Sequence, residues 1–162
     1  MAMAKLKKTN AVRLLDSLKI SYRLLEFAVD ESDLSAEKAA ALLCRPLEQV
    51  FKTLVARGDK NGVMIATIPG NTELNLKALA RLSGNKKVEL VPLKEVQQLT
   101  GYIRGAVSPL GIRGHYPRYL DHSAFNHAQI ITSAGVRGLQ IELDPHDLVR
   151  AIDATTGQIT SS

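Results

Sequence analysis

Hydrophobic residues recur along this chain at two spacings, one typical of helices and one typical of strands. Apolar positions three or four residues apart predict helices over residues 9–20, 35–43, 76–82, 93–99 and 145–152. Short apolar runs predict strands over residues 22–27, 51–57, 63–68, 88–91, 118–121, 129–133 and 139–143. Capping residues support the helices, since Thr9 or Asn10 and Ser35 precede two of them and Gly84 follows a third.

Turn signals between these segments indicate how the strands pair. Residues 58–62 read Gly-Asp-Lys-Asn-Gly, which predicts a hairpin between the strands on either side. The second of these strands, 63–68, is apolar without interruption, so we expect it to be buried on both faces. Residues 71–75 are polar and residues 101–114 are rich in glycine, and both segments are expected to be loops.

The length and the order of elements fit one domain. A chain of 162 residues can bury about two thirds of its unfolded surface, and no repeat, linker or low-complexity stretch divides it. We therefore expect a single α+β domain over residues 1–162, with its core over about 9–152. Its sheet is expected to be a mixed, mostly antiparallel central sheet or a partial barrel, flanked by helices.

Composition excludes several classes of protein. Aromatic residues make up 4% of the chain and tryptophan is absent, which argues against an aromatic platform for base stacking. The single cysteine, Cys44, excludes an intramolecular disulfide and is expected to be a core residue. The start of the chain lacks the apolar centre of a signal peptide, and no apolar run approaches the roughly 18 residues of a membrane span. We expect a cytoplasmic protein with no membrane partner. Its net charge of +5 permits a polyanionic binding partner.

Three segments carry the candidate chemistry. Lys52 opens an apolar strand on the same face as Leu54 and Ala56, where its ammonium group must reach solvent or meet an anion. Residues 101–111 read Gly-Tyr-Ile-Arg-Gly-Ala-Val-Ser-Pro-Leu-Gly, and residues 133–138 read Ser-Ala-Gly-Val-Arg-Gly. Glycines let backbone N–H groups approach a ligand closely, so two such loops and a cation could bind an anion or a reacting ester. Each segment also has a purely structural interpretation: a solvated strand-end lysine, a turn-rich crossover and a glycine hairpin.

Other polar residues give weaker signals. Ser133 lacks the Gly-x-Ser-x-Gly elbow of hydrolase nucleophiles, so an acyl-serine mechanism is not expected. Asp121 ends a predicted strand, where it could orient a substrate amine or cap a turn. We expect no metal site, because none of the common zinc spacings is matched by the histidines, which are His115, His122, His127 and His146. An organic cofactor is not expected either.

Taken in order along the chain, these motifs carry a family resemblance. Phe-Lys-Thr-Leu at 51–54, Gly-Tyr-x-x-Gly-x-x-Ser-Pro-Leu-Gly at 101–111 and Ser-x-Gly-x-Arg-Gly at 133–138 resemble the motifs of the YbaK/EbsC aminoacyl-tRNA deacylases. The nearest likeness is to the free-standing bacterial Cys-tRNA(Pro) deacylases, which are related to the editing insertion of bacterial prolyl-tRNA synthetases. The resemblance extends from about Thr9 to Ile152 and implies a YbaK-like α+β fold.

The resemblance implies an enzyme that hydrolyses the ester joining a wrong amino acid to the 3′-terminal ribose of tRNA(Pro). Lys52 would be its catalytic residue, placed against the tRNA end and the scissile ester. The expected substrate-binding residues are Phe27, Thr53, Gly101, Gly105, Ala106, Ser108, Pro109, Gly111, Asp121, Ser133 and Gly135. Family members often have paired glycines where this chain has Gly105-Ala106 and Ala134-Gly135, so two extra methyl groups bear on the size of the pocket.

The resemblance also implies a route for the reaction and a partner. In Cys-specific members the thiol of the substrate is held to attack its own carbonyl, which would explain why no side-chain nucleophile emerges. Prolyl-tRNA synthetase is the expected transient partner. Two alternatives remain open at this point: deacylation of Ala-tRNA(Pro) or another small aminoacyl-tRNA, and a non-catalytic module that binds tRNA ends or a nucleotide.

Overall fold

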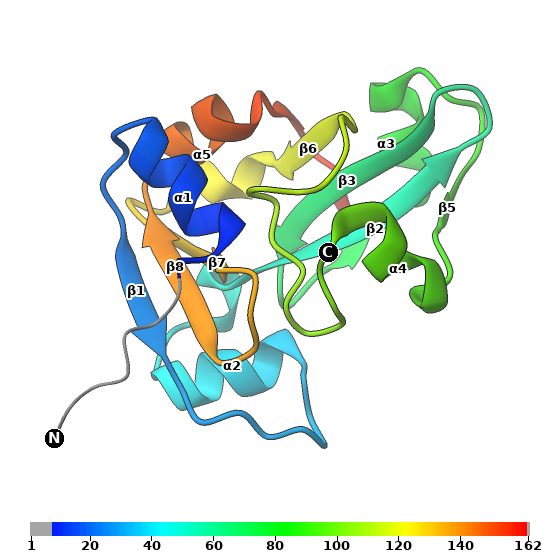
Figure 1. Ribbon diagram of the computed structural model, residues 1–162. Coiled ribbons are helices and arrows are strands. Elements are labelled where there is room, and N and C mark those ends of the chain that lie inside the picture. Colours follow the sequence, from blue (N-terminus) through cyan, green and yellow to red (C-terminus); the bar gives the residue numbers. More distant parts are fainter. Residues whose placement is uncertain (1–7, 162) are drawn as a thin grey trace, which may run out of the picture.

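The computed structural model describes residues 8–161 and has the expected α+β architecture (Figure 1). Its α-helices each contain eight residues and coincide with the predicted ones: α1 (Asn10–Ser17), α2 (Ala36–Leu43), α3 (Leu76–Ser83), α4 (Leu93–Thr100) and α5 (Pro145–Ile152). Two short 3-10 helices are also present, η1 (Leu47–Gln49) and η2 (His122–Asn126). None of the helices described is long and apolar enough to cross a membrane. The first residues of the chain, which led us to expect no signal peptide, lie outside the described range.

The described strands form three sheets. A mixed five-stranded sheet has the order β5-β2-β3-β6-β9, with β5 (Val88–Leu90), β2 (Phe51–Gly58), β3 (Gly62–Pro69), β6 (Arg118–Asp121) and β9 (Thr155–Gly157). An antiparallel sheet has the order β1-β8-β7, with β1 (Arg23–Glu26), β8 (Leu139–Leu143) and β7 (Ile130–Ser133). The third sheet pairs β4 (Glu73–Leu74) with β10 (Thr160–Ser161). The α+β class with mostly antiparallel pairing is confirmed, and none of the described sheets closes into a barrel.

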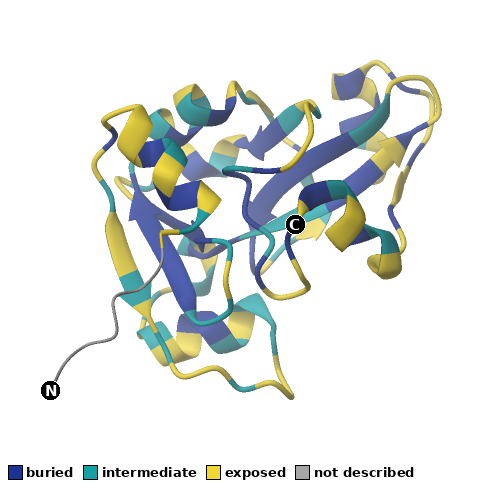
Figure 2. Cartoon of the chain, in the orientation of Figure 1, coloured by how far each residue is buried: buried dark blue, intermediate teal, exposed yellow. Residues whose placement is uncertain are grey.

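The predicted hairpin is the centre of the larger sheet. Strands β2 and β3 pair along their whole length, from Phe51 opposite Pro69 to Gly58 opposite Gly62. Strand β3 is buried on both faces, since Ile65 packs into one apolar cluster and Met64 into another. Figure 2 shows this burial running along β3 and β8, whereas β1 is mostly exposed at the edge of its sheet. The continuous apolar run in the sequence was therefore a reliable sign of a central strand.

Capping side chains fix where the helices begin and end. The hydroxyl groups of Thr9 and Ser35 and the amide oxygen of Asn75 each accept a hydrogen bond from a backbone N–H of the first helical turn. The C-cap of α2 is Cys44, which is exposed and has a left-handed backbone with φ of 55°. The expectation that Cys44 is a core residue is therefore wrong: it stands one residue past the helix, at the position that turns the chain away.

The fold continues past the core expected from the sequence. Strand β9 adds a parallel edge to β6, and Ile159 is fully buried in the cluster that includes Leu79. Strand β10 pairs with β4, which lies within residues 71–75, the segment predicted as a loop. These strands are two or three residues long, too short for an alternating pattern to be recognised.

Candidate functional site

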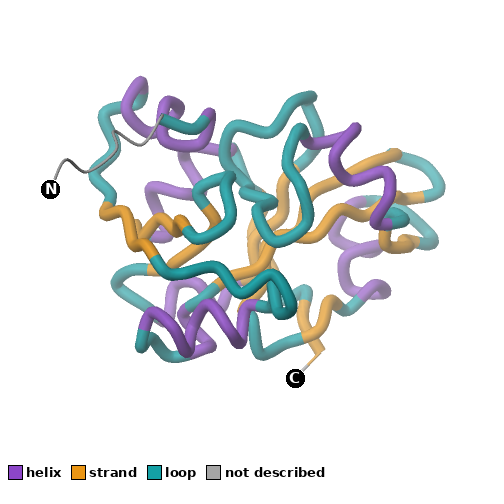
Figure 3. The backbone as a smooth tube through the Cα atoms, turned by 60° about the horizontal axis from the view of Figure 1, so that its bottom comes forward, coloured by secondary structure: helices purple, strands orange, loops and turns teal. Residues whose placement is uncertain are grey.

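A cavity of about 360 Å³ is lined by residues from both larger sheets and from the loops around them. Strand β2 contributes its first residues, while β7 and β8 contribute the residues next to the turn that joins them. Helix α2 and the loop before it line another side. Figures 1 and 3 show the path of these segments along the chain. The remaining wall comes from Arg104, Gly105 and Val107 of the glycine-rich loop. All three candidate segments of the sequence therefore reach one cavity.

Five of the expected site residues line this cavity, and Lys52 is the most informative of them. The half-buried Lys52 donates a hydrogen bond from Nζ to the carbonyl oxygen of Gly70, at 3.3 Å. One contact leaves two of its three N–H donors for other partners. Thr53 also lines the cavity, and its Oγ1 lies 3.1 Å from Oγ1 of Thr67 on β3. The others are Phe27, Gly105 and Ser133.

Ser133 and Gly105 meet the cavity for different reasons. Ser133 is buried at the end of β7, and its Oγ accepts a hydrogen bond from the N–H of Gly135 at 3.1 Å. Its own proton remains available for donation. Gly105 has a φ of +82°, and a Cβ there would lie 3.0 Å from Cβ of Leu34. A glycine at this position therefore lets the loop approach the segment in front of α2.

Seven expected site residues do not line the cavity: Gly101, Ala106, Ser108, Pro109, Gly111, Asp121 and Gly135. Their contacts hold the surrounding loops in place. Gly101 is the left-handed C-cap of α4, with φ of 83°. The hydroxyl group of Ser108 is buried and accepts a hydrogen bond from the N–H of Leu110 at 3.2 Å. The carbonyl oxygen of Pro109 accepts one from Nε of Arg118 at 3.4 Å.

Asp121 acts as a turn-capping residue, one of the two roles considered for it. One carboxylate oxygen accepts hydrogen bonds from the N–H and the hydroxyl of Ser123, the second residue of η2. The other accepts a hydrogen bond from the N–H of Ile159 at 2.9 Å. Because Asp121 is only 2% exposed and both oxygens are occupied, it joins β6 to the C-terminal segment rather than facing the cavity.

Two further glycines fix the loops through close backbone contact. A Cβ on Gly111 would lie 2.7 Å from the carbonyl carbon of Asn10, at the start of α1. A Cβ on Gly135 would lie 2.7 Å from the ring of Tyr102. The hydroxyl of Tyr102 donates to the carbonyl oxygen of Leu110 at 2.6 Å, so one buried ring links both glycine motifs. Neither extra methyl group narrows the cavity, because Ala106 and Ala134 are fully buried and are not among its lining residues.

Besides Lys52, four charged residues line the cavity, and all four are half-buried or exposed. We call them the rim: Asp30, Asp33, Arg104 and Arg137. Arg137 donates from Nε to the carbonyl oxygen of Arg104 at 3.0 Å, and this contact joins the two glycine-containing loops. Arg137 also lies 3.8 Å from the carboxylate of Glu31. The sequence pointed to this residue only indirectly, since it is the arginine of the Ser-x-Gly-x-Arg-Gly motif.

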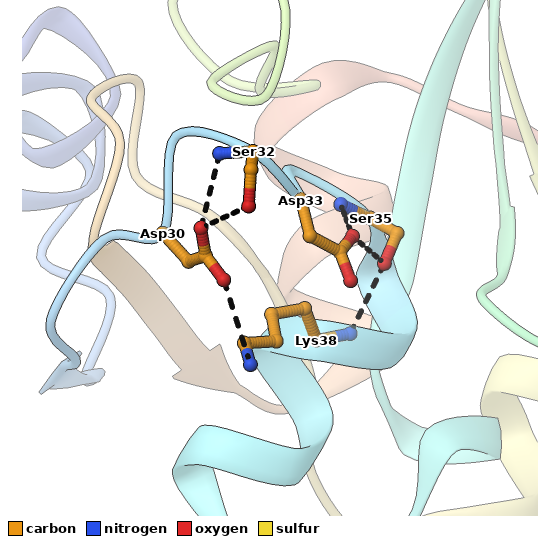
Figure 4. A network of polar contacts seen from close by, with 5 residues as sticks. All are labelled: Asp30, Ser32, Asp33, Ser35 and Lys38. Carbon is orange, nitrogen blue, oxygen red and sulfur yellow. Dashed lines mark hydrogen bonds and ion pairs between the residues drawn. The ribbon is translucent and has the colours of Figure 1, made fainter.

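The acidic loop in front of α2 is held in shape by its own side chains (Figure 4). Hydrogen bonds from the hydroxyl and the N–H of Ser32 keep the pKa of Asp30 below its ordinary value of 3.8. The hydroxyl and the N–H of Ser35 lower the pKa of Asp33 in the same way. Lys38 adds an ion pair with Asp30 at 3.6 Å. Both carboxylates therefore stay charged at neutral pH and face the same cavity as the arginines.

The most buried residues of the cavity are neutral, and we call them the floor: Ala39, Val50, Phe51, Ser133 and Gln140. Gln140 was not expected from the sequence. No histidine or cysteine is among the described residues that line the cavity. Across residues 8–161, no group of three His, Cys, Asp or Glu side chains is placed to hold a metal ion. The cavity thus offers ammonium, guanidinium and hydroxyl donors, but no imidazole to activate a serine or cysteine nucleophile.

Comparison with known proteins shows matches over most of the chain. Residues 30–151 match the family model described as "Aminoacyl-tRNA editing domain". The chain is 47% identical to an Enterococcus faecalis protein named "Putative Cys-tRNA(Pro)/Cys-tRNA(Cys) deacylase EbsC", over 98% of this chain and 99% of that protein. It is 31% identical to a proline–tRNA ligase of Pelotomaculum thermopropionicum, over 49% of this chain and 14% of the ligase. A crystal structure described as "a putative trans-editing enzyme for prolyl tRNA synthetase" has the same fold, with a TM-score of 0.81, 23% identity, and coverage of 99% of this chain and 100% of that one.

Proposed function

Because the chain belongs to the aminoacyl-tRNA editing domain family, we propose that it hydrolyses the ester linking cysteine to the 3′-terminal ribose of tRNA(Pro). The observation that carries this proposal is the composition of the cavity. Lys52, Thr53 and Ser133 bring donor groups to a small pocket that no histidine or cysteine lines among the described residues. Such a pocket suits a substrate that brings its own nucleophile.

Lys52 is the proposed catalytic residue. Ester cleavage passes through a tetrahedral intermediate whose carbonyl oxygen becomes negative, and donors fixed before the reaction stabilise it most effectively. The contact with Gly70 holds the ammonium group of Lys52 at the opening of β2, beside the hydroxyl-bearing Thr53. From there it would bind the carbonyl oxygen of the ester or the terminal phosphate and so position the scissile bond.

The thiol of the bound cysteine is the proposed nucleophile. Its sulfur attacks the carbonyl carbon of the same residue, a C–S bond forms, and the C–O bond to the ribose breaks. The thiol proton passes to the departing 3′-oxygen, so tRNA leaves with a free hydroxyl group and the amino acid leaves as a cyclic thioester. Water then opens that ring to give free cysteine. The enzyme has only to orient the ester and stabilise the developing charge, which matches a cavity made of donors.

The proposed substrate is the aminoacylated end of tRNA(Pro), and prolyl-tRNA synthetase is the proposed transient partner. The likeness to a proline–tRNA ligase supports the proposed partner. The match covers about half of this chain but only a small part of the ligase, so one segment of the synthetase resembles this domain. The rim arginines suit the phosphates of the tRNA end, since guanidinium groups bind phosphate oxygens in a bidentate manner. An enzyme with this substrate would act in the cytoplasm, where tRNA is charged.

The test is release of labelled amino acid from Cys-tRNA(Pro), Ala-tRNA(Pro) and Ser-tRNA(Pro) by the native protein. The thiol-assisted route predicts rapid loss of cysteine and little loss of alanine or serine. Comparable turnover of Ala-tRNA(Pro) would keep the deacylase activity but reject both the cysteine specificity and the thiol nucleophile. Protection of all three esters by bound protein would instead identify a non-catalytic module for tRNA ends.

A further inference from the structure

The floor of the cavity contains one polar side chain that the structure leaves without a partner. Along β8, the side chains of Leu139, Ile141 and Leu143 all pack into the same apolar cluster. Since side chains alternate along a strand, Gln140 points to the opposite face. Its register partner there is Ser133 of β7, which also lines the cavity.

The amide group of Gln140 forms no side-chain hydrogen bond with any residue in the range 8–161, although Gln140 is only 7% exposed. The next residue on the same face, Glu142, behaves differently. It is 4% exposed and is paired with Arg45 and, at 3.6 Å, with Arg23. Among the described residues the one fully buried side-chain polar atom without a partner is Oγ1 of Thr132, so the amide atoms of Gln140 are open to the cavity rather than sealed in the core. The side chain of Gln140 is thus mostly covered, while its amide opens into the cavity and is available to hydrogen-bond a ligand there.

The distribution of charge shows which part of the ligand reaches this amide. The charged rim residues are Asp30, Asp33, Arg104 and Arg137. Around Gln140 the floor is neutral and its other members are small or apolar, apart from the hydroxyl of Ser133. A phosphate, or the α-ammonium group of the amino acid, is better matched by the rim. A small uncharged side chain is better matched by the floor, where a charge would lose its hydration without an ionic partner.

We propose that Gln140 is a specificity-determining residue whose amide hydrogen-bonds the head group of the amino-acid side chain held on the floor; this rests on the proposed deacylase function. An amide both donates and accepts, so it can accept from the S–H of a cysteine thiol and donate to its sulfur. The methyl group of alanine offers neither contact and leaves the buried amide unpaired. Sites that hydrogen-bond a substrate group discriminate against analogues that lack it.

The test replaces Gln140 by methionine, which keeps an unbranched side chain of similar length but removes the amide. We expect kcat/KM for Cys-tRNA(Pro) to fall about tenfold, the loss associated with one hydrogen bond of about 1.4 kcal/mol. The value for Ala-tRNA(Pro) should change less than about twofold on the same scale, so the preference for cysteine narrows about tenfold. The Gln140→Glu variant should also have a lower kcat/KM for Cys-tRNA(Pro) than the native protein, because its carboxylate repels the developing thiolate.

Binding of uncleavable analogues separates this inference from the proposed function. The probes are 3′-amino-3′-deoxyadenosine carrying cysteine or alanine through an amide bond. The inference predicts weaker binding of the cysteine probe alone to the Gln140→Met variant. Equal weakening of both probes would place Gln140 against the shared part of the substrate, and no change would remove it from the site; either result overturns the inference. A native protein that binds the cysteine probe through Gln140 but cleaves no ester would refute the proposed function only.

Thr132→Val is the matched control. Thr132 lies beside Ser133 on β7, is fully buried, and has an Oγ1 without a partner within residues 8–161, but its side chain points away from the cavity. Removing this hydroxyl should leave kcat/KM for both substrates unchanged. Thermal melts of each variant check that the fold is retained. A Thr132→Val variant with the same loss of cysteine preference would show that the Gln140 effect is structural.

Discussion

Replacing Gly111 by alanine is expected to destabilise the protein strongly, although Gly111 does not line the cavity. Its backbone has a φ of +69°, a conformation that costs an L-residue about 1–2 kcal/mol. The new Cβ would also lie 2.7 Å and 2.8 Å from backbone atoms of Asn10 and Ala11, which cannot rotate away as a side chain would. Overpacking of this kind costs about 1–3 kcal/mol. The two contributions give a loss of roughly 2–5 kcal/mol.

Gly62→Ala provides the control that separates these contributions. Gly62 has nearly the same φ, +72°, but no atom lies within 4 Å of the position its Cβ would take. Only the backbone cost of about 1–2 kcal/mol should therefore appear. Urea denaturation gives both free energies of unfolding, and thermal melts should show a shift of about 2–4 °C per kcal/mol.

The expected result is a loss for Gly111→Ala that exceeds the loss for Gly62→Ala by about 1–3 kcal/mol. Equal losses would refute the reasoning, because they would mean that the contact between this loop and the start of α1 is not close. A stable Gly111→Ala variant with impaired deacylation would instead return Gly111 to the substrate-binding residues expected from the sequence.

Three further predictions concern stability and titration. Thr132→Val should stabilise the protein by about 1 kcal/mol in urea denaturation, since it removes an unpaired buried hydroxyl; destabilisation would mean that the hydroxyl has a partner. NMR titration should place the pKa values of Asp30 and Asp33 below 3.8, so their contribution to stability is present above that pH and is lost as the pH falls through the folded-state values. Midpoints at or above 3.8 would contradict the hydrogen bonds of the acidic loop. Burial raises the pKa of Tyr102 to about 12. Its contribution to folding stability is therefore complete below the ordinary value of 10 and is lost as the pH rises toward 12, and Tyr102→Phe should remove this part of the alkaline loss of stability.

Local signals were sufficient to predict most of the fold. The α-helices match because their apolar spacing is accompanied by capping residues such as Thr9 and Ser35, whose action depends only on neighbouring backbone. The hairpin of β2 and β3 follows from a turn sequence and a long apolar run. The C-terminal strands could not be predicted, because they are stabilised by distant partners. The N–H of Ile159, for example, donates to Asp121, and β10 pairs with β4.

The candidate site, too, was predictable only in part from local sequence signals. The motifs located the segments that meet at the cavity, but a motif does not tell which of its members face a ligand and which fix the loop. Gly111 and Gly135 are placed by contacts with Asn10 and Tyr102, and these contacts depend on tertiary packing. Gln140 gave no signal in the sequence, because the polar positions of the alternating strand Leu-Gln-Ile-Glu-Leu could face either solvent or a cavity.

The central claim is that an aminoacyl ester is cleaved in this cavity with Lys52 positioning the ester and stabilising the developing charge. The most direct test is single-turnover release of cysteine from Cys-tRNA(Pro) by the native protein and two variants. Lys52→Ala removes the cavity lysine, while Lys60→Ala removes an exposed lysine at the other end of the same hairpin and keeps the same net charge as the first variant. The account predicts rapid release by the native protein and by Lys60→Ala, and a rate lower by about a hundredfold or more for Lys52→Ala. Release by Lys52→Ala at the native rate would contradict it.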